Sequence, residues 1–322
     1  MVWTQYGPPG VLRLQDVDRP VPRADELLIG VHATAVTAGD CELRGLRFSL
    51  GLRLRVRLMM GPMRPRHKVL GQEFAGEVAE VGPAVTDFAS GDQVFGTTGV
   101  RFGAYAEYIC LPQRSRGSAL TNKPANMSYD EAVTVPTGGL GALHFLRRAG
   151  DLRGRKVLII GAGGGIGAFA VQLAKHFGAE VTGVDRSEKL DLLRSIGADR
   201  VIDYTREDFT QRDECYDVIF DVVGKTAFSA RISRLNPQGR YLWGNPGPSA
   251  TARGLGTSMR GGRKVIRGAS RQKTEDLVFL RELIEAGRIR TVIDQRFPLE
   301  EIADAHRYFE GGVARGCVVI TL

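Results

Sequence analysis

The sequence predicts an α/β protein in which a β-rich domain precedes a doubly wound parallel sheet. At residues 157–177 an apolar strand runs into a glycine turn and then a helix, as in the first half of a βαβ unit. Short strands separated by Gly and Pro fill residues 1–122, whereas strands and helices alternate from about residue 125. The 322 residues also exceed the roughly 250–300 that one hydrophobic core usually holds, so two domains are expected.

Strand candidates in the N-terminal part lie at residues 11–14, 26–33 and 74–82. Turn residues bound them, as in the Gly7-Pro8-Pro9-Gly10 run and the Gly82-Pro83 pair. Few helices are expected between these strands, which indicates a compact β-rich domain.

The glycine turn after residue 160 is the strongest functional signal. Four aliphatic residues, 157–160, suit a strand buried on both faces of a parallel sheet. Ala162-x-Gly164-x-x-Gly167 fits the fingerprint in which backbone N–H groups approach a pyrophosphate at a helix N-terminus. The coenzyme contacts expected here are Gly161, Gly164, Gly165, Ile166 and Gly167. A glycine turn that binds no ligand is the alternative.

Charged residues follow the second strand of this unit, residues 181–184. Asp185 ends the strand 18 residues beyond Gly167, near the roughly 20 expected for a ribose-binding acid. It favours NADH, because its carboxylate would repel a 2′-phosphate. Arg186 and Lys189 instead offer positive charge to that phosphate, so the residues leave the choice between NADH and NADPH open.

The elements after this unit continue the alternation. Four more strands are predicted at 200–203, 216–221, 239–243 and 264–267, which makes six in the parallel sheet. A helix over 274–286 and a short helix from about residue 300 lead to a last strand at 317–320.

Composition places the chain among ordinary soluble proteins. Hydrophobic residues make up 43% and charged residues 25%, and no stretch approaches the roughly 20 apolar residues that span a bilayer. Residues 1–10 contain no apolar run of signal-peptide length, so a cytoplasmic location is expected. The four cysteines are far apart, which favours reduced thiols.

The net charge of +8 comes largely from two stretches without acidic residues, 43–72 and 222–274. A solvated surface is one interpretation, and attraction to phosphorylated ligands or to an anionic membrane is the other. Within the first stretch, residues 52–58 alternate Leu or Val with Arg, which would place every Arg on one face of an extended flap. We expect weak membrane contact through this flap and, in the absence of any recognised motif, no nucleic-acid binding.

Several motifs together resemble one family. Gly71-x-Glu73-x-x-Gly76-x-Val78, the glycine turn and the final 316–320 segment resemble the medium-chain dehydrogenase/reductase superfamily over essentially the whole chain. Residues 196–204 and 220–224 look like its zinc-free quinone oxidoreductase and enone reductase branch. The resemblance implies a GroES-like catalytic domain (1–123, completed by 270–322), a Rossmann coenzyme domain (124–269), and an active site in the cleft between them.

Two positions depart from the zinc alcohol dehydrogenases of this superfamily. Those enzymes have a Cys three residues before an Asp, and this chain has Thr37 three residues before Asp40. They also have a His at the middle position of Gly-x-Glu, where this chain has Gln72. A hydroxyl and an amide are poor zinc ligands beside thiolate and imidazole, so no bound zinc is expected. Residues 96–108 also lack the cysteines of the structural zinc lobe. Quinone reductase relatives usually have Asn in place of Thr37, and Cys317 replaces a usual Lys.

Without a metal to polarise a carbonyl, hydride delivery to an activated C=C bond is favoured. We expect Thr37 to stabilise the enolate oxygen, and Asp40 either to orient Thr37 or to act only as a local cap in a turn after a strand. Tyr105 is expected to form an aromatic wall, to donate a proton or to fill the core. The resemblance favours NADPH as the coenzyme, with NAD possible. It adds Tyr204, Val223 and Asn245 to the coenzyme site. A homodimer is expected. A zinc-free carbonyl or enoyl-thioester reductase, and a coenzyme-binding protein without turnover, are the alternatives.

Overall fold

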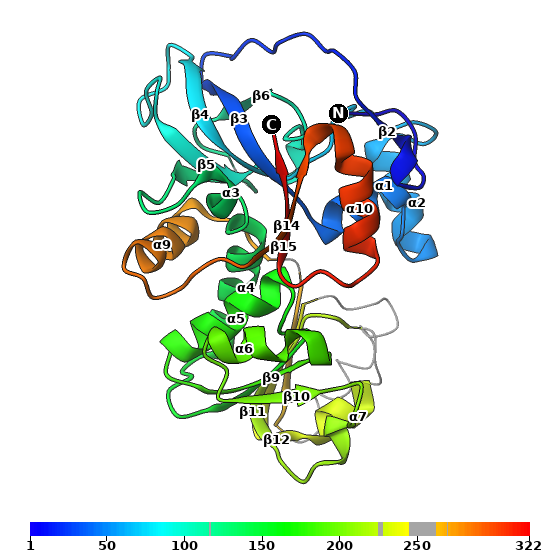
Figure 1. The fold of residues 1–322 in the computed structure, drawn as a ribbon, viewed down its shortest axis with the longest axis vertical. Coiled ribbons are helices and arrows are strands. Elements are labelled where there is room, and N and C mark those ends of the chain that lie inside the picture. Colours follow the sequence, from blue (N-terminus) through cyan, green and yellow to red (C-terminus); the bar gives the residue numbers. More distant parts are fainter. Residues whose placement is uncertain (116, 225–227, 245–261, 269) are drawn as a thin grey trace. The chain divides into compact units, whose positions relative to one another are not determined.

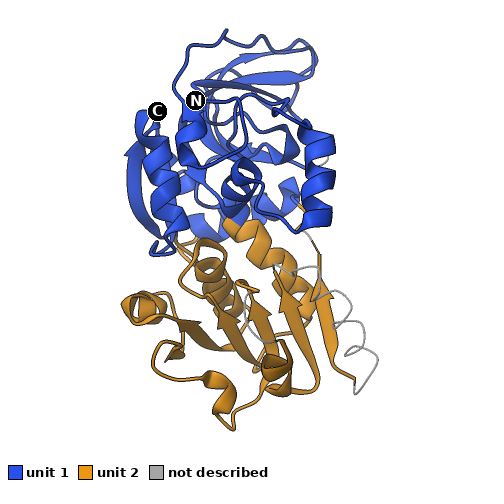
Figure 2. Ribbon diagram, turned by 90° about the vertical axis from the view of Figure 1, so that its right-hand side faces the viewer, with its two compact units in different colours: residues 1–137, 272–285, 291–322 blue, residues 138–271, 286–290 orange. Residues whose placement is uncertain are grey.

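The computed structural model describes residues 1–115, 117–224, 228–244, 262–268 and 270–322. The chain divides into two compact units (Figure 2). Unit 1 comprises Met1–Thr137, Gln272–Glu285 and Thr291–Leu322, and unit 2 comprises Gly138–Arg271 and Ala286–Arg290. The boundary after Thr137 lies beyond the predicted residue 123, because the segment after strand β7 (Ala119–Asn122) packs on the first sheet: Tyr129 stacks on His32 at 4.4 Å between ring centroids.

Unit 1 is built on a seven-stranded sheet around its longest strand, β3 (Glu26–Val36). Strand β3 pairs in antiparallel fashion with β4 (Glu73–Val81), β6 (Tyr108–Pro112) and β15 (Cys317–Thr321). The other strands of the sheet are β5 (Gln93–Thr97), β7 (Ala119–Asn122) and β14 (Ile293–Pro298). The C-terminal strand thus lies inside the N-terminal sheet (Figure 1).

Helices and short segments complete unit 1. A two-stranded pair, β1 (Val2–Trp3) and β2 (Leu12–Arg13), lies near the N-terminus. The α-helices are α1 (Ala38–Gly45), α2 (Leu50–Met60), α3 (Tyr129–Ala132), α9 (Thr274–Glu285) and α10 (Ile302–Glu310). Single 3₁₀ turns occur at η1 (Pro9–Val11), η2 (Gly99–Arg101) and η5 (Leu299–Glu301).

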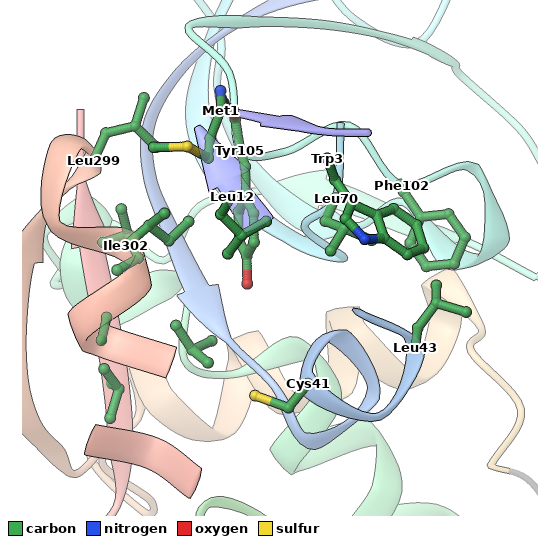
Figure 3. Close-up of a cluster of buried hydrophobic side chains, with 14 of the residues drawn as sticks. Met1, Trp3, Leu12, Cys41, Leu43, Leu70, Phe102, Tyr105, Leu299 and Ile302 are labelled. Atoms are coloured by element: carbon green, nitrogen blue, oxygen red, sulfur yellow. Dashed lines mark hydrogen bonds between the residues drawn. The ribbon is translucent and has the colours of Figure 1, made fainter. Parts of the chain in front are cut away.

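One hydrophobic cluster joins the N-terminal strands, helix α1 and helix α10 (Figure 3). Trp3, Leu70 and Tyr105 are fully buried in it, and Ile302 brings in α10. The Tyr105 hydroxyl points toward the side of α1 that carries Cys41 (Figure 3). The cluster therefore surrounds polar groups as well as apolar ones.

Unit 2 contains a six-stranded, fully parallel sheet with the order β10-β9-β8-β11-β12-β13. Its strands are β8 (Lys156–Ile160), β9 (Glu180–Asp185), β10 (Arg200–Asp203), β11 (Tyr216–Asp221), β12 (Leu235–Trp243) and β13 (Lys264–Arg267). The crossover helices are α4 (Pro136–Ala149, beginning in unit 1), α5 (Gly165–His176), α6 (Leu190–Ser195) and α7 (Phe228–Ser233), with 3₁₀ turns η3 (Ser187–Lys189) and η4 (Phe209–Gln211). The order reverses between β8 and β11, which confirms the predicted doubly wound sheet.

The extended flap predicted for residues 52–58 is wrong, because the structure has helix α2 there. Leu, Arg and Met all have good helix propensity, and the end of β3 leads into helices rather than to a partner strand for this segment. Helix α2 buries none of its residues completely, and Gly61 ends it with a φ of 125°. Helix α4 was not predicted, since its run of glycines hides the helical period.

Among the described residues, no helix is both long and apolar enough to cross a membrane.

Candidate functional site

The glycine turn after strand β8 is shaped by steric limits that favour glycine. Gly161 has a φ of 80° and donates its N–H to the Val184 carbonyl over 3.0 Å. A Cβ on Gly167 would lie 2.1 Å from the Gly161 carbonyl oxygen, so only glycine lets helix α5 come this close. The N-terminus of α5 is therefore held directly against the end of β8.

This helix end fits the diphosphate of a dinucleotide. Gly164 is the N-cap residue of α5 and has no side chain to bond the first N–H groups. The first turn contains no acidic residue, and the helix dipole favours an anion there. The predicted contacts Gly161, Gly164, Gly165, Ile166 and Gly167 all lie in this turn or in the first turn of α5.

Asp185, the predicted ribose-binding acid, is held in place by hydrogen bonds from the backbone around it. Its Oδ2 accepts from Gly163 N over 2.8 Å, and its Oδ1 accepts from Arg186 N over 2.9 Å. Lys189 Nζ lies 3.8 Å from Oδ1, and both side chains are less than a tenth exposed. The carboxylate is thus hydrogen-bonded and partly neutralised, which weakens its repulsion of a nearby phosphate.

The other predicted coenzyme residues lie around the same strand ends. Arg186 Nη2 donates to Tyr204 Oη over 3.4 Å, and Tyr204 is 49% exposed after strand β10. Val223 Cγ2 would be 2.5 Å from a Cβ on Gly161, so the Val223 loop borders the glycine turn. Asn245 lies outside the described residues. Except for Asn245, the structure brings the predicted coenzyme residues to the carboxyl edge of the unit 2 sheet.

The predicted catalytic residues lie in unit 1, where Thr37 and Asp40 begin helix α1. Thr37 Oγ1 accepts from Asp40 N over 3.1 Å, and Asp40 Oδ2 accepts from Thr37 N over 3.2 Å. The two side chains also contact each other, with 2.6 Å between Thr37 Oγ1 and Asp40 Oδ2. This is a capping box, in which each side chain bonds the other residue's backbone. The expected capping role of Asp40 is therefore present.

Tyr105 joins a buried hydrogen-bond chain that ends on helix α10. Arg44 Nε donates to His306 Nδ1 over 3.3 Å, which we assign as leaving the ring proton on Nε2. Nε2 lies 3.2 Å from Tyr105 Oη. Burial, together with the nearby Arg44 charge, lowers the pKa of His306 to about 3, so the ring is neutral. Arg44 itself pairs with Glu310.

A second buried carboxyl group lies on strand β4. Glu73 Oε1 accepts from Thr137 N over 2.6 Å at the start of α4, and burial raises the pKa of Glu73 to about 7. Three residues of this region were not predicted as site residues: Glu73, Arg44 and His306. The Gly71-x-Glu73 motif was a usable signal for Glu73, whereas His306 stands in a helix without a motif.

Comparison with known proteins identifies the family. Residues 23–121 match the alcohol dehydrogenase GroES-like domain, and residues 196–320 match the zinc-binding dehydrogenase domain. The chain is 32% identical to 2-methylene-furan-3-one reductase of Solanum lycopersicum, over 99% of this chain and 77% of that protein. It is 33% identical to a quinone oxidoreductase of Pseudomonas aeruginosa, over 98% and 97%. The chain belongs to the medium-chain dehydrogenase/reductase superfamily.

Solved structures of this superfamily share the fold over the whole chain. A quinone oxidoreductase from Coxiella burnetii superimposes with a TM-score of 0.87 at 29% identity, covering 100% of this chain and 98% of that one. An NAD-dependent alcohol dehydrogenase superimposes with a TM-score of 0.86 at 28% identity, with the same coverage. The predicted GroES-like and Rossmann folds are therefore confirmed.

One of the two matched domains is named for zinc, and a catalytic zinc site needs Cys, His, Asp or Glu donors. No group of three or more His, Cys, Asp or Glu side chains that could hold a metal ion occurs in the part of the chain that the structure describes. Thr37 and Gln72 occupy the two key positions, and neither offers a thiolate or an imidazole. The residues present do not fit a catalytic zinc ion.

Proposed function

We propose that this chain is an NAD(P)H-dependent reductase that delivers hydride to a quinone or an α,β-unsaturated carbonyl, without zinc. The observation that carries the proposal is the glycine turn, where a Cβ on Gly167 would lie 2.1 Å from a backbone oxygen and the helix end is left for a diphosphate. Relatives named as reductases of a furanone, of alkenals and alkenones, and of quinones support this substrate class. The reduced nicotinamide, when bound, supplies the hydride.

The residues of unit 1 have the task of stabilising negative charge on the acceptor oxygen. Thr37 Oγ1 is the proposed donor to that oxygen, because a neutral hydroxyl suffices where the charge is delocalised. Asp40 positions Thr37 through the capping box. Tyr105 is completely buried and acts through its neighbours, as a member of the hydrogen-bond chain to His306.

Two alternatives have separate experimental signatures. A carbonyl or enoyl-thioester reductase would oxidise NAD(P)H with a saturated ketone or with an enoyl thioester. A coenzyme-binding protein without turnover would bind NAD(P)H, and none of the acceptors would oxidise the bound coenzyme. Coenzyme oxidation measured over a panel of quinones, enones, ketones and thioesters separates these cases.

For the coenzyme, we propose that both NADPH and NADH bind, with a modest preference for NADPH. The Asp185 carboxylate is engaged by Gly163 N and lies near Lys189, while Arg186 and the half-exposed Tyr204 stand next to it. Loss of a hydrogen bond to a charged group costs about 1.5–3 kcal/mol, so Arg186→Ala is expected to weaken NADPH binding roughly tenfold or more. NADH binding should change much less, since it has no 2′-phosphate.

Titration of protein fluorescence with each coenzyme measures both affinities. Arg194→Ala is the matched control, because it removes an Arg that pairs with Asp191 on helix α6. Equal losses for NADPH and NADH in Arg186→Ala would remove Arg186 from the phosphate site.

We also propose that helix α2 rests on an anionic membrane surface on the cytoplasmic side. Leu50, Leu54 and Leu58 recur every fourth residue and are 85%, 62% and 63% exposed. Arg53 and Arg55 are exposed beside them, and residues 43–72 contain no acidic residue. Exposed leucines flanked by cations suit a headgroup layer that carries negative charge.

Co-sedimentation with vesicles of phosphatidylcholine, with and without phosphatidylglycerol, tests this contact. Binding should require the anionic lipid, weaken with salt, and be lost in Leu54→Glu but kept in Val21→Glu, which alters an apolar residue outside α2 that is 83% exposed. Binding that ignores anionic lipid and salt would contradict the proposal. A homodimer that Leu54→Glu dissociates in light scattering would show that a second copy covers α2 instead.

A further inference from the structure

Thr37 has one hydroxyl proton, which it can donate either to the Asp40 carboxylate or to the acceptor oxygen of a substrate. The Thr37 oxygen already accepts from Asp40 N, at 3.1 Å. The 2.6 Å contact between Thr37 Oγ1 and Asp40 Oδ2 must contain one proton, which belongs either to Thr37 or to Asp40. If Asp40 is ionised, the Thr37 proton fills this contact. If Asp40 is protonated, its own proton fills the contact and the Thr37 proton is free to point elsewhere.

The surroundings of Asp40 favour the neutral carboxyl group. Asp40 is completely buried, and its Oδ1 has no partner with hydrogen-bond geometry among the described residues. No salt bridge to Asp40 occurs in that part of the chain either, and Arg44, one turn along the helix, pairs with Glu310. A buried carboxylate without a cation is costly, whereas the neutral acid needs far less compensation.

Among the described residues, the groups around Asp40 lie on helix α1, on strand β4 and on the segments that carry Gly71 and Tyr105, while His306 of α10 contacts Tyr105. None of these groups supplies a positive charge at the Asp40 oxygens. Tyr105 belongs to the segment before β6, and its hydroxyl and the Gly71 backbone oppose the rise in the pKa of Asp40. His306 of α10 is neutral, and Glu73 of β4 adds like charge when ionised. Cys41 on α1 remains a thiol because burial raises its pKa. Burial is the largest influence on Asp40 and raises its pKa to about 6.

We propose that the protonation state of Asp40 sets the direction of the Thr37 hydrogen bond and thereby switches Thr37 between a donor held by Asp40 and a donor free for the acceptor oxygen. This inference rests on the proposed function, in which Thr37 donates to that oxygen. Asp40 is then a positioning residue, because it acts through Thr37. The proton remains between Asp40 and Thr37, and no bond of the substrate is formed or broken by the switch.

The pH dependence of kcat with an enone is the first test. Asp40 is neutral below its pKa, so kcat should be highest near pH 5 and should fall through a midpoint near pH 6, by up to about tenfold per pH unit. Asp40→Asn replaces the carboxyl group by an amide that does not titrate, so this midpoint should vanish whichever way the amide faces. Glu73→Gln is the matched control: it removes a second buried carboxyl group that interacts with Asp40, and it should keep a midpoint, displaced to lower pH by the loss of like charge.

A second readout is independent of turnover. Carbon-13 NMR of the Asp carboxyl groups in the free protein, with the Asp40 signal assigned through Asp40→Asn, should give a midpoint near 6 that coincides with that of kcat. An Asp40 signal that titrates at or below the ordinary value of 3.8, or a kcat midpoint that persists in Asp40→Asn, would overturn the inference. If no acceptor is reduced at any pH, the proposed function fails, while the NMR titration still decides whether Asp40 is neutral.

Discussion

Thr37→Val is expected to lower kcat with a conjugated enone about ten- to a hundredfold and to leave coenzyme affinity nearly unchanged. Valine keeps the shape of threonine but removes the only hydroxyl proposed to donate to the acceptor oxygen. A donor aimed at developing charge contributes mainly in the transition state, so the loss appears in kcat rather than in binding. Steady-state kinetics at pH 5.5, with the coenzyme saturating, measure the effect where Asp40 is largely neutral.

The capping box makes controls necessary, because Thr37 is also the N-cap of helix α1. Losing an N-cap costs about 1 kcal/mol of stability. Thr37→Ser retains both the cap and the hydroxyl and should keep most of the activity. Ser128→Ala removes an equivalent capping box from helix α3 and should lower thermal stability without lowering kcat. A kinetically silent Thr37→Val would exclude Thr37 as the donor.

Local patterns predicted the parts of the fold in which one physical requirement dominates. The four aliphatic residues 157–160 predicted strand β8, and the glycines after them predicted the turn at Gly161. Asp185 marked the end of the next strand, β9. All three elements lie where they were expected. The prediction of an extended segment at residues 52–58 was wrong, because two requirements conflict there. Their alternation of Leu and Arg satisfies a period of two, but helix propensity and the lack of a partner strand decide the outcome.

The candidate site was only half predictable. Asp40 was expected either to orient Thr37 or to act as a local cap in a turn after a strand, and the structure shows that the two residues form a capping box at the start of helix α1. His306 contacts Arg44 and Cys41 across 262 and 265 residues of chain, and no local period records such a contact. The burial that raises the pKa of Asp40 and keeps His306 neutral also depends on packing of α10 against α1, which the sequence does not display.

The chemical class of the acceptor is expected to have the largest effect on the rate. Hydride delivery to an enone or a quinone creates negative charge that conjugation spreads, so a single hydroxyl donor stabilises it adequately. Delivery to an unconjugated aldehyde concentrates the charge on one alkoxide oxygen, which zinc would ordinarily offset. Each 1.4 kcal/mol of missing stabilisation costs a factor of ten in rate, so a deficit of about 3 kcal/mol slows turnover about a hundredfold.

The most direct measurement is NADPH oxidation by one preparation with a conjugated enone and with the saturated aldehyde of the same carbon number, with the product identified by mass spectrometry. The zinc content of that preparation, purified without chelator, is determined by elemental analysis. We predict reduction of the C=C bond, kcat/KM at least about a hundredfold higher for the enone, and far less than one zinc per chain. Equal rates with the saturated aldehyde, or about one zinc per chain, would contradict the account.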